Sequence, residues 1–224
     1  MTDRLEKFRV IITGVTGMVG EGVLLECLES PAVEHVLVLG RRPYGVTHPK
    51  LEECIAKDFT KLGSAVEDRL RGYDACFNCA GVSSAGMSEA EYTKIAYDMV
   101  LSFAETLVRL NPKMIFIHVT GASTDSTEKG RQMWARVKGR AENALLRVGF
   151  AEVYNFRPGL MKPTPGQKSI KGLYRVLLVL LPIFRLFMKT LTLRQVGQAM
   201  IHAVTKGHDK PVLEVADIAA LAAE

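Results

Sequence analysis

The sequence predicts an α/β protein: a doubly wound parallel sheet of six to seven strands, with helices on both faces and a small C-terminal segment on the substrate side. Short apolar stretches rich in β-branched residues alternate with longer amphipathic ones, which is typical of parallel sheets. A glycine-rich turn follows the first apolar stretch. The 224 residues and the 48% hydrophobic fraction suit one domain with a sizeable core.

The glycine-rich turn joins an expected strand at 10–12 to an expected helix at 23–28, with three glycines at a spacing of three. A helix start has unpaired N–H groups and a partial positive charge, which favour a phosphate, and glycine lets the backbone approach it. A tight turn without a ligand is the alternative, but the strand–turn–helix context favours a dinucleotide. The predicted contacts are Gly14, Thr16, Gly17, Met18, Val19 and Gly20.

The second expected strand, 35–39, ends at Arg41 and Arg42. Folds that prefer NAD carry an acidic residue about 20 residues beyond the glycine turn, where it binds the ribose hydroxyls. Two arginines stand there instead, and a guanidinium group binds phosphate with a planar fork of donors. We therefore predict NADP rather than NAD, the alternative being two exposed loop arginines.

A weak third strand is expected at 54–56. Asp58, just after it, either accepts a hydrogen bond from the adenine amino group or lies in a surface loop. Asp58 and the adjacent Phe59 are the candidates for this side of the cofactor.

The fourth strand and its exit turn, 75–81, contain Cys76 and Cys79. Two residues three apart on a strand face opposite sides, and the sequence has no second cysteine pair and no histidine pair at ligand spacing, so we expect no metal site. A redox pair would stand at a helix start, which this pair does not. Both are predicted to be buried core cysteines.

A long helix is predicted to begin at the capping box of Ser88 and Glu91 and to end before Pro112. Its apolar residues recur at every fourth position, and we interpret them as core rather than as cofactor contacts. They are Ile95, Met99, Phe103 and Leu107.

The fifth strand, 114–119, leads into a loop at its carboxyl end, where such sheets carry their ligand chemistry. His118 within the strand is predicted to be a satisfied core histidine. A helix over 134–142 that Gly149 closes, and a sixth strand that ends in 154–159, come next.

The C-terminal part contains an apolar stretch at 173–188, bracketed by Arg175 and Arg185. It is too short to span a bilayer, which needs about 20 apolar residues. It is a buried helix over the substrate cleft, a homodimer interface or a weak membrane-surface contact. Three elements are expected after it: a capped helix that Gly207 closes, a short strand at 212–215 and a small terminal helix after Asp217.

The formal net charge of +5 is unevenly distributed, because 153–208 contains no Asp or Glu. Its basic residues form a solvated surface or attract an anionic cofactor, substrate or lipid. No aromatic interleaving or DNA-binding motif accompanies them, so nucleic acid is not the expected partner. The first residues carry both charges and no apolar signal core, which predicts a cytoplasmic location.

Together these motifs resemble the short-chain dehydrogenase/reductase superfamily over most of the chain, and its atypical branch near the Tat-interacting oxidoreductase and the NmrA-like regulators. The resemblance rests on 13–20, 78–81, Ser123, Lys138 and 157–159. It implies one NAD(P)-binding, Rossmann-like domain over 1–224, with the nucleotide-binding core at 1–160 and a substrate or interaction portion at 161–224. It also implies cofactor contacts from Cys79, Ala80, Gly81, Lys138, Pro158 and Gly159.

In that superfamily a Ser, a Tyr and a Lys do the chemistry, and the Tyr stands four residues before the Lys. Ser123 and Lys138 match, but Trp134 occupies the Tyr position. An indole N–H only donates hydrogen bonds and is no general acid near neutral pH. The resemblance thus leaves Lys138 as a ligand of the nicotinamide ribose and Ser123 as a group that polarises a carbonyl.

Two functions from different classes follow. The first is an NADPH-dependent oxidoreductase acting on a small carbonyl or conjugated substrate, with water as the proton source; the retained Ser123 and Lys138 favour it. The second is a non-catalytic NADP(H)-sensing protein, which Trp134 favours. A sugar-nucleotide epimerase or dehydratase fits less well, because those enzymes resemble this chain at the glycine turn but usually retain the Tyr and carry a larger C-terminal domain.

Overall fold

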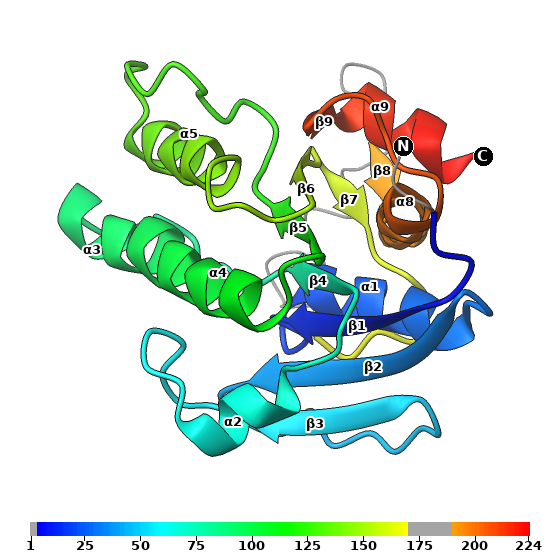
Figure 1. Ribbon diagram of the computed structural model, residues 1–224. Helices are drawn as coiled ribbons and strands as arrows, with labels where there is room; N and C mark the ends of the chain where they lie inside the picture. Colours follow the sequence, from blue (N-terminus) through cyan, green and yellow to red (C-terminus); the bar gives the residue numbers. More distant parts are fainter. Residues whose placement is uncertain (1–3, 170–189) are drawn as a thin grey trace.

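The computed structural model describes residues 4–169 and 190–224, and within them it confirms the predicted parallel sheet (Figure 1). Seven described strands lie in the order β3-β2-β1-β4-β5-β6-β9, and every neighbouring pair is parallel. The order reverses between β1 and β4, where ligands bind in open α/β sheets. The strands are β1 (Phe8–Thr13), β2 (Val33–Gly40), β3 (Leu51–Ile55), β4 (Ala75–Asn78), β5 (Ile115–Val119), β6 (Glu152–Arg157) and β9 (Val212–Glu214).

Helices cover both faces of the sheet, as predicted (Figure 1). One face carries α1 (Met18–Glu29), α8 (Leu193–Thr205) and α9 (Val215–Ala222), and the other carries α2 (Ser64–Arg69), α3 (Glu89–Thr93), α4 (Met99–Leu110) and α5 (Met133–Leu145). Val10 and Ile12 of β1 pack towards α1, while Ile11 packs towards α4. A strand buried on both faces must be apolar at every position, which is why 10–12 is an unbroken apolar run.

The predicted long helix is present but is not regular throughout. Ser88 caps α3 by accepting a hydrogen bond from the Glu91 N–H at 3.3 Å, and the Glu91 carboxylate accepts one from the Ser88 N–H at 2.9 Å. A π-helical stretch, η1 (Lys94–Asp98), then separates α3 from α4. Such stretches shift the residues that follow onto a different face of the helix and often occur at functional sites.

Two local predictions need correction, and one small sheet was not predicted. Helix α5 ends at Leu145 with Leu146 as its cap, and Gly149, with a φ of 106°, lies in the connection beyond the helix rather than closing it. The terminal helix begins at Val215, directly after β9. A second, two-stranded parallel sheet was not predicted: β7 (Met161–Lys162) pairs with β8 (Leu191–Thr192).

The apolar stretch 173–188 lies outside the described residues, so its three interpretations stay predictions. In the part of the chain that the structure describes, no helix is both long enough and apolar enough to cross a membrane.

Candidate dinucleotide-binding site

A cavity of about 500 Å³ opens at the carboxyl ends of β1, β2 and β4, where the strand order reverses. The glycine turn, the loops after β2, β3 and β4, and one side of the η1–α4 helix form its walls. It gathers most of the predicted cofactor residues: Gly14, Thr16, Gly17, Arg41, Arg42, Asp58, Phe59, Cys79, Ala80 and Gly81. The cavity is also lined by residues that were not predicted as cofactor contacts: Val15, Leu39, Gly40, Lys57, Val82, Ser83, Ile95 and Met99.

The three glycines of the turn have different roles. Gly14 has a φ of +75°, and a Cβ there would lie 2.6 Å from the backbone of Cys79 and Ala80. A Cβ on Gly20 would lie 2.3 Å from the Gly14 carbonyl oxygen, so this glycine lets α1 pack against the turn. Gly17 caps α1 without any side-chain hydrogen bond and lines the cavity, which leaves the first-turn N–H groups open to an anion.

Alanine at Gly17 and at Gly20 should therefore act differently. Gly17→Ala meets only the Gly14 oxygen, at 3.3 Å, at a φ of −103° that alanine adopts readily. We expect its free energy of unfolding to change by less than about 0.5 kcal/mol. Its cofactor affinity should fall about tenfold, because the methyl group stands where a phosphate approaches. Gly20→Ala should cost about 1–3 kcal/mol of stability through overpacking. Urea unfolding and NADPH titration of both variants check this, and equal loss of stability would contradict it.

The loops after β2 and β3 bring three exposed cations to the cavity wall: Arg41, Arg42 and Lys57. Asp58 lines the same wall, but its Oδ1 already accepts hydrogen bonds from the Thr60 N–H at 2.8 Å and the Thr60 hydroxyl at 2.7 Å. These hydrogen bonds lower the pKa of Asp58. Phe59 is buried beside Phe103, with ring centroids 5.4 Å apart, and contributes an apolar surface to the cavity lining next to Asp58.

The apolar stripe of the long helix divides between core and cavity. Phe103 and Leu107 are buried in the core, as predicted, but Ile95 and Met99 are partly buried and line the cavity. Our interpretation of all four as core is therefore wrong for Ile95, and it holds only in part for Met99, which packs against the core and also lines the cavity. Ile95 lies within the π-helical stretch, where four-residue spacing does not keep one face, and Met99 is the first residue of α4, at the end of the stripe nearest the cavity.

The catalytic candidates lie on the other side of the β4 loop, around the carboxyl end of β5, outside the lining of the cavity. The Lys138 Nζ of α5 donates a hydrogen bond to the Thr120 carbonyl oxygen at 2.9 Å. Ser123, further along the loop that Thr120 begins, is exposed and has a φ of 69°, which non-glycine residues rarely adopt. The remaining predicted contacts also lie outside the lining of this cavity: Met18, Val19, Gly20, Pro158 and Gly159.

His118 is buried, as predicted, within a row of polar side chains across three strands. The Thr13 hydroxyl donates to the Asn78 Oδ1 at 2.6 Å, and the Asn78 Nδ2 lies 3.1 Å from the His118 Nδ1. Because the Asn78 oxygen already accepts, its amide group donates to Nδ1, and His118 carries its proton on Nε2. Burial, helped by the nearby Lys138 charge, lowers the pKa of His118 to about 3, so the ring is neutral.

The two cysteines of the C-x-x-C pair face opposite sides of the sheet, as predicted. Cys76 is a buried core residue, but Cys79 is only partly buried and lines the cavity, so the core assignment is wrong for Cys79. Burial raises the pKa of Cys79 to about 12, which keeps it a protonated thiol. Within 4–169 and 190–224, no three His, Cys, Asp or Glu side chains come together as metal ligands would.

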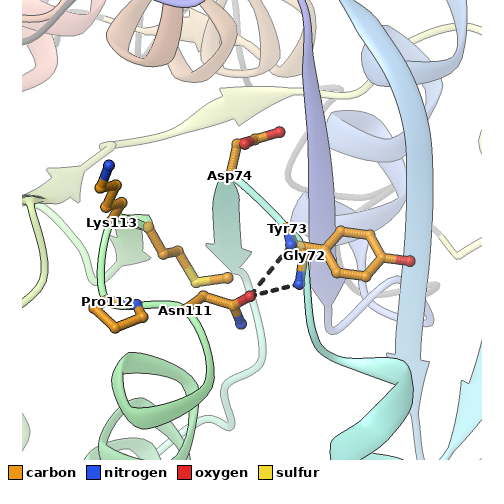
Figure 2. A pocket seen from close by; sticks show the side chains of 7 residues that line it. Gly72, Tyr73, Asp74, Asn111, Pro112 and Lys113 are labelled. Carbon is orange, nitrogen blue, oxygen red and sulfur yellow. Dashed lines mark hydrogen bonds between the residues drawn. The ribbon is translucent and has the colours of Figure 1, made fainter.

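A second hollow, of about 380 Å³, lies at the opposite edge of the sheet, before β4 and β5 (Figure 2). Its polar groups hold loops together: the Asn111 Oδ1 accepts hydrogen bonds from the Gly72 N–H at 2.8 Å and the Tyr73 N–H at 3.3 Å. Asp74 accepts one from the Arg9 N–H at 2.8 Å. The hollow is a feature of loop packing at the amino ends of the strands, away from the glycine turn.

The family model of the NAD dependent epimerase/dehydratase family matches residues 10–131, which is more than half of the chain. The chain belongs to this family. Its cofactor class is therefore a nicotinamide dinucleotide, and the resemblance to the short-chain dehydrogenase/reductase superfamily is confirmed.

Two curated relatives are the mitochondrial protein FMP52 of Candida albicans and the mitochondrial protein fmp52 of Emericella nidulans. The first is 25% identical over 154 residues, covering 67% of this chain and 66% of the relative. The second is 27% identical over 158 residues, covering 68% and 66%. The matches thus span just under two thirds of each relative. Both are named mitochondrial, which contradicts the predicted cytoplasmic location. That prediction rested only on the composition of the first residues.

Solved structures share the fold. The Bordetella bronchiseptica enzyme WbmH in complex with NAD+ aligns with a TM-score of 0.67 at 17% identity, covering 92% of this chain and 74% of that one. The Helicobacter pylori ADP-L-glycero-D-manno-heptose-6-epimerase aligns with a TM-score of 0.68 at 18% identity, covering 99% and 83%. The predicted Rossmann-like class is confirmed.

Proposed function

We propose that this chain is an NADP(H)-dependent oxidoreductase that reduces a small carbonyl or conjugated substrate. The observation that carries the proposal is the set of three cations, Arg41, Arg42 and Lys57, on the wall of the cavity that the glycine turn opens into. In this fold the end of β2 faces the adenosine ribose, so a 2′-phosphate on that ribose would meet two guanidinium groups and an ammonium.

The charge on that wall argues against NAD. A ribose with two free hydroxyls needs a carboxylate acceptor, and Asp58 is the sole acidic residue among the described residues of the cavity lining. Its Oδ1 is already engaged by Thr60. Three cations facing a neutral ribose would lack a counter-charge, whereas a phosphate dianion would supply one.

The rest of the site fits a reductase. A bound NADPH supplies the hydride; the protein supplies binding and orientation. In this proposal the Lys138 ammonium, which is held by the Thr120 carbonyl at the carboxyl end of β5, would bind the ribose hydroxyls. Ser123 would donate a hydrogen bond to the substrate carbonyl oxygen. Residues 161–224 would form the substrate side: the Gln167 side chain donates to the Met18 carbonyl at 2.7 Å, so this segment crosses the first turn of α1.

A second candidate is a non-catalytic NADP(H)-sensing protein, and Trp134 is the observation that favours it. The usual tyrosine position of α5 carries a side chain that cannot exchange a proton with a substrate. In that case cofactor binding alone would be the function.

Cofactor titration followed by a turnover assay separates the candidates. NADPH and NADH binding is measured by fluorescence at one ionic strength, and NADPH absorbance is then followed with aldehydes, quinones and flavins. NADPH binding with turnover supports the reductase. Tight binding without turnover supports the sensor, and no binding would refute both.

Lys57 gives a sharp test of the phosphate wall, because the chain offers a matched control four residues away. Lys57→Ala should weaken NADPH about tenfold, the value of roughly one charge-assisted contact, and leave NADH unchanged. Lys61→Ala removes the same charge from a residue that does not line the cavity and should change neither affinity. If the two variants behave alike, Lys57 acts only through long-range charge.

A further inference from the structure

With Trp134 in place of a tyrosine, the proposed reduction lacks a proton donor, and Lys138 lies close enough to Trp134 to be considered for that role. Trp134 stands one helical turn before Lys138 on α5, and the Lys138 Nζ lies 6.0 Å from the centroid of its ring. The indole therefore packs beside the ammonium where a phenol would have donated a proton. Lys138 is the next side chain along the helix that can release a proton, because the guanidinium of Arg136 is not deprotonated in proteins.

The Lys138 ammonium is incompletely satisfied by protein. It is partly buried, and its hydrogen bond to the Thr120 carbonyl, at 2.9 Å, is the one that the described residues provide. An ammonium has three N–H donors, so two remain for ligands. Thr120 directly follows β5, at the carboxyl edge of the sheet where the cofactor cavity also lies.

The charged groups around Lys138 do not neutralise it. Glu142, one turn later on α5, accepts hydrogen bonds from the Thr120 hydroxyl at 2.5 Å and from the Arg157 guanidinium of β6. Arg157 in turn pairs with Glu214, the last residue of β9, at 3.0 Å. His118 of β5 is neutral. Burial lowers the pKa of Lys138, and the Glu142 charge only partly opposes that effect, so the ammonium is a stronger acid than an exposed lysine.

From this placement we infer that Lys138 is the proton donor of the reduction, an inference that rests on the proposed function. As hydride adds to the substrate carbonyl carbon, an N–H bond of Nζ breaks and an O–H bond forms on the carbonyl oxygen. The carbonyl is reduced to an alcohol and the dihydronicotinamide is oxidised. Lys138 is left as a neutral amine, which regains its proton from water, so each cycle consumes one proton.

Lys138→Arg separates proton donation from ribose binding. Arginine keeps the positive charge and the N–H donors but does not release a proton in proteins. We expect the variant to bind NADPH within about threefold of wild type and to lose about 10²–10⁴-fold in kcat, the usual effect of a positioned general acid. Lys129→Arg, at an exposed lysine of the preceding loop, should change neither quantity.

The pH dependence of the rate distinguishes proton donation from a purely structural role of Lys138, because a structural role would not make the rate follow the pKa of Lys138. In wild type, kcat/KM for reduction should fall as the pH rises through the pKa of Lys138. That pKa is expected to lie below the value of about 10.4 of an ordinary lysine. The same pKa is measured without turnover by competitive acetylation of the NADPH complex with acetic anhydride, read by mass spectrometry, with exposed Lys113 and Lys206 as references. Adding ethylamine should restore part of the rate to Lys138→Ala.

The outcomes separate the inference from the proposed function. Wild-type turnover that Lys138→Arg leaves intact, or acetylation of Lys138 that titrates with the reference lysines, overturns the inference alone. NADPH binding without turnover of any carbonyl overturns the reductase function and the donor role with it. Impaired kcat with retained NADPH affinity, a matching pKa from both measurements and amine rescue support the inference.

Discussion

Replacing Arg41 and Arg42 together by alanine is expected to remove the preference for NADPH. The dissociation constant of NADPH should rise about 100-fold or more, because two charge-assisted contacts to a phosphate are worth about 3 kcal/mol or more together. NADH lacks the 2′-phosphate, so its dissociation constant should change by less than about threefold on the same reasoning. Both side chains are exposed and line the cavity, and therefore the fold should not change.

The control for this variant removes the same charge elsewhere. Arg147 and Lys113 are exposed and lie outside the cavity lining, so their double alanine variant lowers the net charge by the same amount. Titrations at two salt concentrations separate contact from long-range attraction, since salt screens the latter over roughly 10 Å. An equal loss of NADPH and NADH affinity in Arg41→Ala/Arg42→Ala would refute the phosphate assignment.

The parts of the fold that sequence predicted best are those where one local pattern has one structural meaning. The strand at 10–12 is buried on both faces, so its composition alone identifies it. Capping boxes at Ser88 and Thr192 mark two helix starts because a side chain and a backbone N–H must pair there, and both pairs are present. The glycine turn could be predicted to bind a dinucleotide because a strand, the turn and a helix follow one another directly along the chain.

The missed features depend on partners distant in sequence or on local irregularity. Strands β7 and β8 have two residues each, too few for any periodicity, and each is defined by its partner about 30 residues away. Ile95 and Met99 carry the spacing of a core stripe, yet both line the cavity. Ile95 lies in the π-helical stretch η1, which leaves no mark in the apolar pattern. Lys57 looks like any surface lysine until the loops after β2 and β3 meet.

Arg157 is a residue whose motif could be identified from the sequence but whose interaction partners could not. The resemblance marked it as part of a family motif, but nothing in the sequence named its partners. In the structure its guanidinium lies between Glu142 of α5 and Glu214, and it also donates to the Ser126 hydroxyl at 2.5 Å. Because Glu142 accepts from the Thr120 hydroxyl as well, this buried network holds the loop after β5, against which Lys138 rests.

Glu142→Gln should therefore be among the most destabilising changes in the chain, lowering the unfolding free energy by about 3–5 kcal/mol. The Glu142 and Arg157 side chains are only 1% and 9% exposed, so loss of the carboxylate leaves a buried guanidinium without its main counter-charge. Glu214→Gln is the matched control. Its side chain is 50% exposed, and removing a solvated partner should cost less than about 1 kcal/mol.

Urea unfolding at pH 7, with the midpoint and slope fitted separately, measures the stability of both variants. An unchanged slope shows that the same amount of surface is exposed on unfolding. A cost for Glu142→Gln no larger than for Glu214→Gln would mean that Arg157 is neutralised by solvent rather than by Glu142. Glu142→Leu combined with Arg157→Met removes both charges and should recover most of the stability, because an apolar pair carries no desolvation penalty. That double variant still lacks the Glu142 carboxylate, so the Thr120 hydroxyl keeps only the Phe156 carbonyl oxygen, at 3.2 Å, as an acceptor among the described residues. A regained stability with a persistently weakened NADPH affinity would thus place the network's functional role in positioning the loop after β5.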